Sequence, residues 1–304
     1  MITTPQPTQF EIFSDEFRPL ITEKMLDYIS FGTTDQRRSL EDAMRYSVAA
    51  GGKRLRPLLV LATYNLFAKD LNPVYPLACA IELLHTYSLI HDDLPSMDND
   101  SLRRGMPTCH VQYGEDIAIL AGDTLNTFSF ELLSTHLAPH FSPAAILRVI
   151  REFAKACGLE GMSGGQVLDL KGIHLNPDAD YLFKTHALKT GALISASVSL
   201  PAILANVSEE TLSIMSQFGD QIGQLFQVVD DVLDVTGTAE SLGKSTNKDH
   251  DQNKLTYIRV FGLEHSLDLI KQQATAARHT LAKLSTHDTQ LLASIVDYIE
   301  TRTT

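Results

Sequence analysis

Apolar residues recur every three or four positions along most of this 304-residue chain, which is the spacing of one face of a helix. No segment shows the sustained apolar–polar alternation that predicts a half-buried strand. Short stretches rich in Pro, Asn or Gly separate the runs. The apolar runs are clearest at residues 81–90, 144–157, 217–235 and 290–300. The pattern predicts an all-α fold, a single large domain over residues 1–304 with about ten or more helices.

Composition narrows the class of protein. The formal net charge is −12, so the chain lacks the basic balance of a nucleic-acid-binding protein and we expect no such partner. Residues 1–13 lack the basic and apolar regions of a signal peptide, and no window approaches 18 uninterrupted apolar residues. Cys79, Cys109 and Cys157 are far apart and predict reduced thiols. We therefore expect a cytoplasmic protein without a membrane span.

Aspartates cluster where an apolar helical run ends. One such cluster is VVDDVLDV (228–235). Asp230 and Asp234 are four residues apart and share one helix face, with Asp231 beside them. Carboxylates at the inner end of an apolar helix repel one another and need a multivalent cation. Oxygen donors without Cys or His favour Mg²⁺, which usually takes one or two carboxylates together with substrate phosphates. The cluster therefore predicts Mg²⁺ and a phosphorylated ligand.

A second cluster, HDDLPSMD (91–98), contains Asp92, Asp93 and Asp98. On an unbroken helix, Asp98 would lie about 120° around the axis from Asp92. Pro95 lies between them, and proline breaks or kinks a helix. We expect the helix to end or bulge there, so that Asp98 returns to the side of Asp92.

Two histidines near this cluster, His91 and His110, are interpreted as structural because Mg²⁺ prefers oxygen donors.

Basic residues accompany both clusters. Two glycines in GGKRLRP (51–57) let backbone N–H groups approach an anion, and arginine grips phosphate in bidentate fashion. An acidic chain with cations beside each carboxylate cluster can hold a diphosphate between metal ions and basic side chains. The basic residues concerned are Lys53, Arg54, Arg56, Arg103, Arg104, Lys189, Lys244 and Lys254.

These motifs together resemble the trans-isoprenyl diphosphate synthases, and most of all the bacterial farnesyl diphosphate synthases. The resemblance runs from about residue 40 to about residue 260 and rests on GGKRLRP, HTYSLIHDDLPSMDNDSLRRGMPTCH, GMSGGQVLDL, KTGAL, FQVVDDVLDVTG, LGKS and NKLTY, in this order. It implies a helical domain around a deep central cavity and a homodimer. It also implies a Mg²⁺-dependent prenyltransferase, with three ions once substrate is bound, that joins isopentenyl diphosphate to allylic diphosphates.

The resemblance also implies a role for each matching residue. Metal ions would bind Asp92, Asp93, Asp98, Asp230, Asp231 and Asp234. The allylic diphosphate would be held by Arg103, Lys189, Lys244 and Lys254. Isopentenyl diphosphate would be held by Gly52, Lys53, Arg56, His85 and Arg104. The oxygens of Thr190 and Gln227 would stabilise the allylic cation. Gln166 and Asp169 would border the cavity.

Product length is predicted from the residues just before the first cluster. Tyr87 lies five residues before Asp92, about 7.5 Å along a helix axis, and its side chain leans further toward the helix N-terminus. A ring there would stop growth at fifteen carbons, whereas the small Ser88 beside it would block little. In the family that the chain resembles, this aromatic and the long DDxxxxD spacing accompany farnesyl products.

Other functions remain open. The same chemistry could stop at geranyl or geranylgeranyl diphosphate. A terpene cyclase would carry one aspartate-rich motif, and a regulatory subunit would lack intact aspartates, whereas both clusters are complete here. A metal-storage bundle would need Glu and ExxH pairs in its core, and none stand out.

Overall fold

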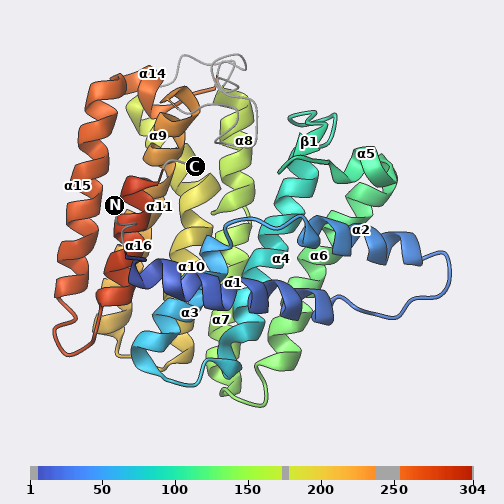
Figure 1. Cartoon of the computed structure of the whole chain (residues 1–304), viewed down its shortest axis with the longest axis horizontal. Coiled ribbons are helices and arrows are strands. Elements are labelled where there is room, and N and C mark those ends of the chain that lie inside the picture. The colour runs from blue at the N-terminus through green and yellow to red at the C-terminus, as the bar shows by residue number, and fades with distance from the viewer. Residues whose placement is uncertain (1–5, 173–177, 237–253, 303–304) are drawn as a thin grey trace, which may run out of the picture.

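The computed structural model describes residues 6–172, 178–236 and 254–302. In these ranges helices dominate, with one short antiparallel pair of strands, so the predicted all-α fold is confirmed (Figure 1). The first half contains α1 (Gln9–Tyr28), α2 (Arg38–Ala49), α3 (Leu55–Phe67), a 3₁₀ turn (Asn72–Val74), α4 (Tyr75–Asp92), β1 (Leu102–Arg103), β2 (Met106–Pro107), α5 (Cys109–Tyr113) and α6 (Glu115–His136). The second half contains α7 (Pro143–Cys157), α8 (Met162–Gly172), α9 (Ala179–His186), the π-helical turn η2 (Ala187–Gly191), α10 (Ala192–Leu204), α11 (Glu209–Thr236), α14 (Tyr257–Phe261), α15 (Leu263–Ala282) and α16 (Gln290–Thr301).

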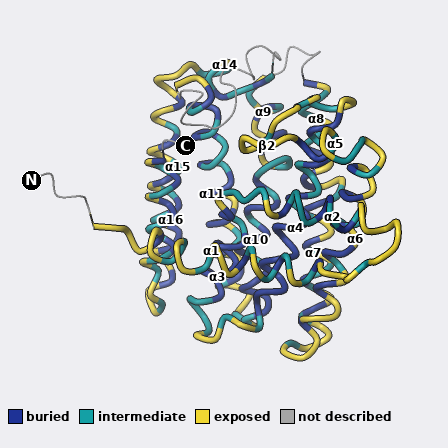
Figure 2. The backbone as a smooth tube through the Cα atoms, turned by 45° about the vertical axis from the view of Figure 1, so that its right-hand side comes forward, coloured by how far each residue is buried: buried dark blue, intermediate teal, exposed yellow. Residues whose placement is uncertain are grey.

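The helix α10 lies at the centre of the bundle. It packs against α3, α7 and α11, and most of its residues are buried (Figure 2). Among the described residues, the stretch Ala179–Leu204 is long and apolar enough to cross a membrane, but 61% of its most apolar window is buried inside the protein. A helix that is apolar all round and packed on several sides is typical of a protein core.

Local signals fix where helices begin. The side chain of Thr8 accepts a hydrogen bond from the Glu11 backbone, and the Glu11 side chain bonds back to the Thr8 backbone, which completes a capping box at α1. The Ser142 hydroxyl caps α7 in a similar way, with Pro143 in the first turn. These caps set the ends of helices that frame the bundle.

A buried ion pair fixes the loop that precedes α3. Arg54, with φ of 53°, donates from Nη1 to Glu82 of α4 at 2.9 Å, and the two side chains are only 1% and 3% exposed. Arg54 also donates to the Val48 carbonyl at the end of α2. The pair therefore ties the glycine-rich loop, and with it Arg56, to α4.

We expect Glu82→Ala to lower the free energy of unfolding by about 3–5 kcal/mol, because the Arg54 charge would stay buried without its carboxylate. Urea denaturation measures this loss. The matched control is Glu23→Ala, an exposed glutamate on α1, which should change stability by less than about 0.5 kcal/mol. Equal, small effects of both substitutions would show that the pair does not hold the loop.

Candidate active site

A cavity of about 510 Å³ lies between α4, α8, η2 and α11. It combines carboxylates and cations with apolar and aromatic side chains. One aspartate from each cluster, Asp92 and Asp230, lines it, so the fold brings the two clusters to one place. Its lining residues are Arg56, His85, Tyr87, Ser88, Leu89, His91, Asp92, Met97, Met162, Ser163, Gln166, Lys189, Thr190, Phe226 and Asp230.

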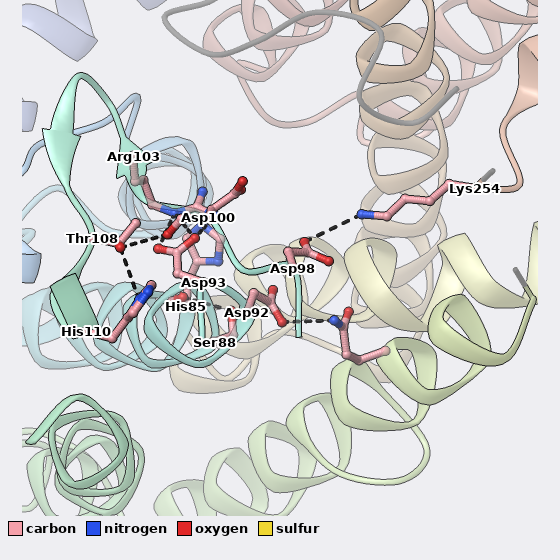
Figure 3. Close-up of polar contacts among 11 residues, drawn as sticks. His85, Ser88, Asp92, Asp93, Asp98, Asp100, Arg103, Thr108, His110 and Lys254 are labelled. Atoms are coloured by element: carbon pink, nitrogen blue, oxygen red, sulfur yellow. Dashed lines mark hydrogen bonds and ion pairs between the residues drawn. The ribbon is translucent and has the colours of Figure 1, made fainter. Parts of the chain in front are cut away.

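The chain reverses direction directly after the first cluster. Helix α4 ends at Asp92, before Pro95, and the backbone N–H of Asp98 donates to the Asp92 carbonyl at 2.9 Å. The predicted break is therefore confirmed, and it returns Asp98 to Asp92. Asp98 then faces Lys254, with 3.5 Å between Oδ2 and Nζ (Figure 3).

Asp92 is held from the opposite wall of the cavity. Its Oδ1 accepts a hydrogen bond from Gln166 Nε2 of α8 at 2.9 Å. Burial raises the pKa of Asp92 to about 6, and the Lys189 charge partly offsets that rise. Burial disfavours the ionised form of this carboxyl group, and a cation that reaches it would favour that form.

Asp93 turns away from Asp98 and toward the hairpin (Figure 3). Arg103 of β1 grips both of its oxygens, with Nε at 2.8 Å from Oδ2 and Nη2 at 2.7 Å from Oδ1. Burial raises the pKa of Asp93, and the hydrogen bonds from Arg103 oppose the rise. The β1–β2 hairpin is thus anchored to the end of α4. Asp93 and Arg103, which are both predicted site residues, bind each other.

Within the second cluster, Asp231 is buried and bound by protein groups. Gln227 Nε2 donates to its Oδ1 at 2.8 Å, and the Tyr257 backbone N–H donates to its Oδ2 at 2.7 Å. Asp234, one turn on, is also buried, and its Oδ2 has no hydrogen-bond partner within the described residues. Such a buried carboxylate oxygen can be satisfied by an ordered water molecule or by a metal ion.

Lys189 is presented by the π-helical turn η2, a distortion common at functional sites. Its Nζ lies 2.5 Å from Asp169 Oδ2 on α8. Burial lowers the pKa of Lys189, but the Asp169 charge, followed by Asp92 and Asp98, outweighs it and raises the pKa. Close approach is possible because α8 has Gly165 here, where a Cβ would lie 2.1 Å from the Lys189 backbone nitrogen.

Only some of the residues expected to hold isopentenyl diphosphate line the same cavity. Arg56 and His85 line it, and burial lowers the pKa of both groups. Arg56 Nε has no hydrogen-bond partner within the described residues. Arg104 lies against the loop, because its Nη1 donates to the Gly51 carbonyl and a Cβ on Gly52 would lie 2.5 Å from its guanidinium. Arg104 and the glycine loop are therefore joined.

Lys53 and Lys244 are the remaining predicted binding residues. Lys53 is exposed and is not one of the lining side chains. Lys244 lies outside the described residues, so its predicted contact with the allylic diphosphate stays a prediction.

Arg302 is a site residue that the sequence reasoning missed. Its side chain is only 2% exposed, and Nη2 lies 2.5 Å from Asp230 Oδ1 and 3.0 Å from the Phe226 carbonyl. The guanidinium also lies over the Phe226 ring, 4.0 Å from its centroid. The only available signal was a single arginine directly after the amphipathic run of α16. Arg302 holds Asp230 at the cavity wall.

The donor set fits Mg²⁺ bound together with a phosphorylated ligand. The candidate ligands are all carboxylates, which suit a hard cation. Among the described residues no group of three or more His, Cys, Asp or Glu side chains could hold an ion alone. Mg²⁺ commonly takes only one or two protein carboxylates and completes its shell with phosphate oxygens and water.

Comparison with known proteins places the chain in a family. The polyprenyl synthetase family model matches residues 37–299. The farnesyl diphosphate synthase of Escherichia coli is 43% identical over 87% of this chain and 89% of its own length. The large subunit 1 of a chloroplastic heterodimeric geranylgeranyl pyrophosphate synthase from Arabidopsis thaliana is 44% identical over 86% of this chain and 72% of its own.

A solved structure agrees with these matches. The geranyltransferase of Helicobacter pylori, complexed with magnesium and isoprenyl diphosphate, has a TM-score of 0.82 and 32% identity, and the alignment covers 97% of each chain. The matched regions include both aspartate clusters and every helix that lines the cavity. The chain therefore belongs to the polyprenyl synthetase family and is a prenyltransferase.

Proposed function

We propose that this prenyl diphosphate synthase condenses isopentenyl diphosphate with dimethylallyl diphosphate and then with geranyl diphosphate, and so makes farnesyl diphosphate. One observation carries the proposal: Asp92, Asp230 and Lys189 line the same cavity as the Tyr87 ring. The charged side chains suit a diphosphate. The aromatic ring, about 7.5 Å further along α4, suits the end of a growing hydrocarbon tail.

In the proposed reaction the C1–O bond of the allylic diphosphate breaks, and the double bond of isopentenyl diphosphate attacks C1. A proton then leaves the new chain, and the released diphosphate accepts it. Mg²⁺, when bound, neutralises charge on the leaving diphosphate. The magnesium and isoprenyl diphosphate in the Helicobacter pylori relative support both ligands for this chain. We propose three ions, held by the aspartates of the two clusters.

Basic side chains of the protein would hold the diphosphates together with the metal ions. Lys189 and Lys254 face Asp169 and Asp98 in the structure, so each can move a short distance to an incoming diphosphate. Arg56 and His85 would hold isopentenyl diphosphate from the α3 and α4 side. Thr190 lines the cavity beside Lys189, where its oxygen would stabilise the allylic cation away from bulk water.

The length of the product is the finer part of the proposal. Relatives with farnesyl and with geranylgeranyl names match at nearly equal identity, so geranylgeranyl diphosphate is the second candidate. The Tyr87 ring favours the shorter product, because it lines the cavity where a fourth isoprene unit would extend.

The proposal is tested by incubating the purified protein with dimethylallyl diphosphate, labelled isopentenyl diphosphate and Mg²⁺. Products are dephosphorylated and sized by chromatography. We expect a fifteen-carbon alcohol as the main product, and none after chelation of Mg²⁺. A twenty-carbon main product would overturn the length, and the absence of any prenyl product would overturn the whole proposal.

Replacing Tyr87 with alanine should move the main product from fifteen carbons to twenty or more, because removing the ring lengthens the apolar part of the cavity. Product sizing under the same conditions measures the shift. Tyr87→Phe is the matched control and should keep the fifteen-carbon product, since the ring rather than the hydroxyl blocks growth. If Tyr87→Ala still made only the fifteen-carbon product, Tyr87 would not be the floor.

We also propose that residues 1–304 form one domain that assembles as a homodimer. Three apolar side chains, Val111, Ile119 and Leu120, are 53%, 44% and 50% exposed on the adjacent helices α5 and α6. Exposed apolar patches of this kind mark association surfaces. Sedimentation equilibrium should give twice the chain mass, and a monomer at micromolar concentration would contradict the dimer.

A further inference from the structure

The floor residue Tyr87 has a partner on its own helix. His91 lies four residues on, so the two side chains share one face of α4. Their rings meet edge to face, with centroids 5.3 Å apart and planes at 90°. Both side chains line the cavity. An edge-to-face contact restricts the tilt of both rings, so the position of His91 affects where the tyrosine ring lies.

His91 is itself fixed from the neighbouring helix. Its Nε2 donates to the backbone carbonyl of Ile119 on α6 at 3.0 Å, which requires a proton on that nitrogen. The imidazole lies over Gly122, one turn along α6, where a Cβ would lie 2.1 Å from Nε2. Only a residue without a side chain leaves this space. The ring is therefore held by a hydrogen bond and by the shape of α6.

Tyr87 also lines the cavity together with residues of α8. Burial raises the pKa of the Tyr87 phenol, and the Ser163 side chain of α8 partly offsets the rise. Ser163 and Met162 line the cavity opposite α4. Tyr87 and His91 thus both project from α4, and the contact with α6 fixes the histidine beside the tyrosine ring. This part of the cavity therefore combines side chains of α4 and α8, and His91 is hydrogen-bonded to the backbone of α6.

We propose that His91 is a specificity-determining residue that positions Tyr87, and that Gly122 is required because it makes room for the imidazole. This inference rests on the proposed function, since it deepens the assignment of product length. It assigns a use to a histidine beside the metal cluster that is chemically unsuited to Mg²⁺. A tyrosine without this support would tilt away from the tail and let elongation continue.

The test compares products of four variants with those of the unchanged protein: His91→Ala, His91→Gln, Gly122→Ala and the double variant His91→Ala/Gly122→Ala. His91→Ala should shift the main product from fifteen to twenty carbons although Tyr87 is intact. His91→Gln keeps an N–H donor for the Ile119 carbonyl and should retain fifteen carbons. Gly122→Ala should push the imidazole toward the cavity and raise the share of ten-carbon product.

The double variant separates positioning from misfolding. Without the imidazole the added methyl group loses its three closest contacts, so the double variant should make the same long product as His91→Ala alone. Fifteen-carbon product from His91→Ala, with a normal thermal midpoint, would overturn the inference. So would equal losses of rate in all variants without any change of product size. Failure of the unchanged protein to make a prenyl product would instead reject the proposed function on which the inference rests.

Discussion

Replacing Asp92 with asparagine should lower kcat for the first condensation by about a thousandfold, which is the order of effect expected when one preorganised electrostatic group is lost. The substitution keeps the shape of the side chain, and its Oδ1 can still accept the hydrogen bond from Gln166. What it removes is the negative charge that would hold Mg²⁺ against the leaving diphosphate. Steady-state rates at saturating substrate and Mg²⁺ measure the loss.

The control for this variant is Asp268→Asn, an exposed aspartate on α15 whose side chain is 59% exposed. It should leave kcat unchanged. A loss of less than tenfold in Asp92→Asn, with normal folding by circular dichroism, would show that Asp92 does not hold a catalytic ion.

Replacing Lys189 with methionine should reduce kcat/KM for the allylic diphosphate by about a hundredfold or more, through loss of one charged contact to the transition state. Methionine keeps much of the side-chain volume, so η2 should hold its shape. The loss should be smaller when isopentenyl diphosphate is the varied substrate, because Lys189 is assigned to the allylic side. The exposed Lys171 on α8 provides the matched control, Lys171→Met, which should keep full activity.

Methionine at position 189 also leaves the Asp169 carboxylate, only 10% exposed, without its cation. This should lower stability, since a buried charge would lose its partner. The double variant Lys189→Met/Asp169→Asn should recover stability but not activity. If it recovered both, Lys189 would serve only to neutralise Asp169, and its assigned contact with the diphosphate would be wrong.

The break after Asp92 shows how much of the site could be predicted from local sequence. An unbroken helix would place Asp92 and Asp98 on different sides of its axis. Pro95 between them predicted where the helix ends. The structure has that ending and the backbone hydrogen bond that returns Asp98. Such features are predictable because they depend on a few neighbouring residues.

Pairing between distant residues could not be predicted in the same way. Helical spacing shows which residues share a face, but it does not show which cation lies opposite which carboxylate. Arg103 grips Asp93, whereas the resemblance assigned both directly to ligands. Arg302 reaches Asp230 from 72 positions along the chain. The first contact depends on how the β1–β2 hairpin folds back onto α4, and the second on how α11 and α16 pack, neither of which apolar periodicity determines.

The most direct test of the two-cluster site is a crystal structure with Mn²⁺ and an unreactive thio analogue of dimethylallyl diphosphate. The anomalous signal of manganese locates each ion. We expect peaks about 2.0–2.3 Å from carboxylate oxygens of Asp92 and Asp98 on one wall and of Asp230 on the other, with the diphosphate between them. A diphosphate bound in this cavity without an ion on either cluster, or ions bound only elsewhere, would contradict the site described above.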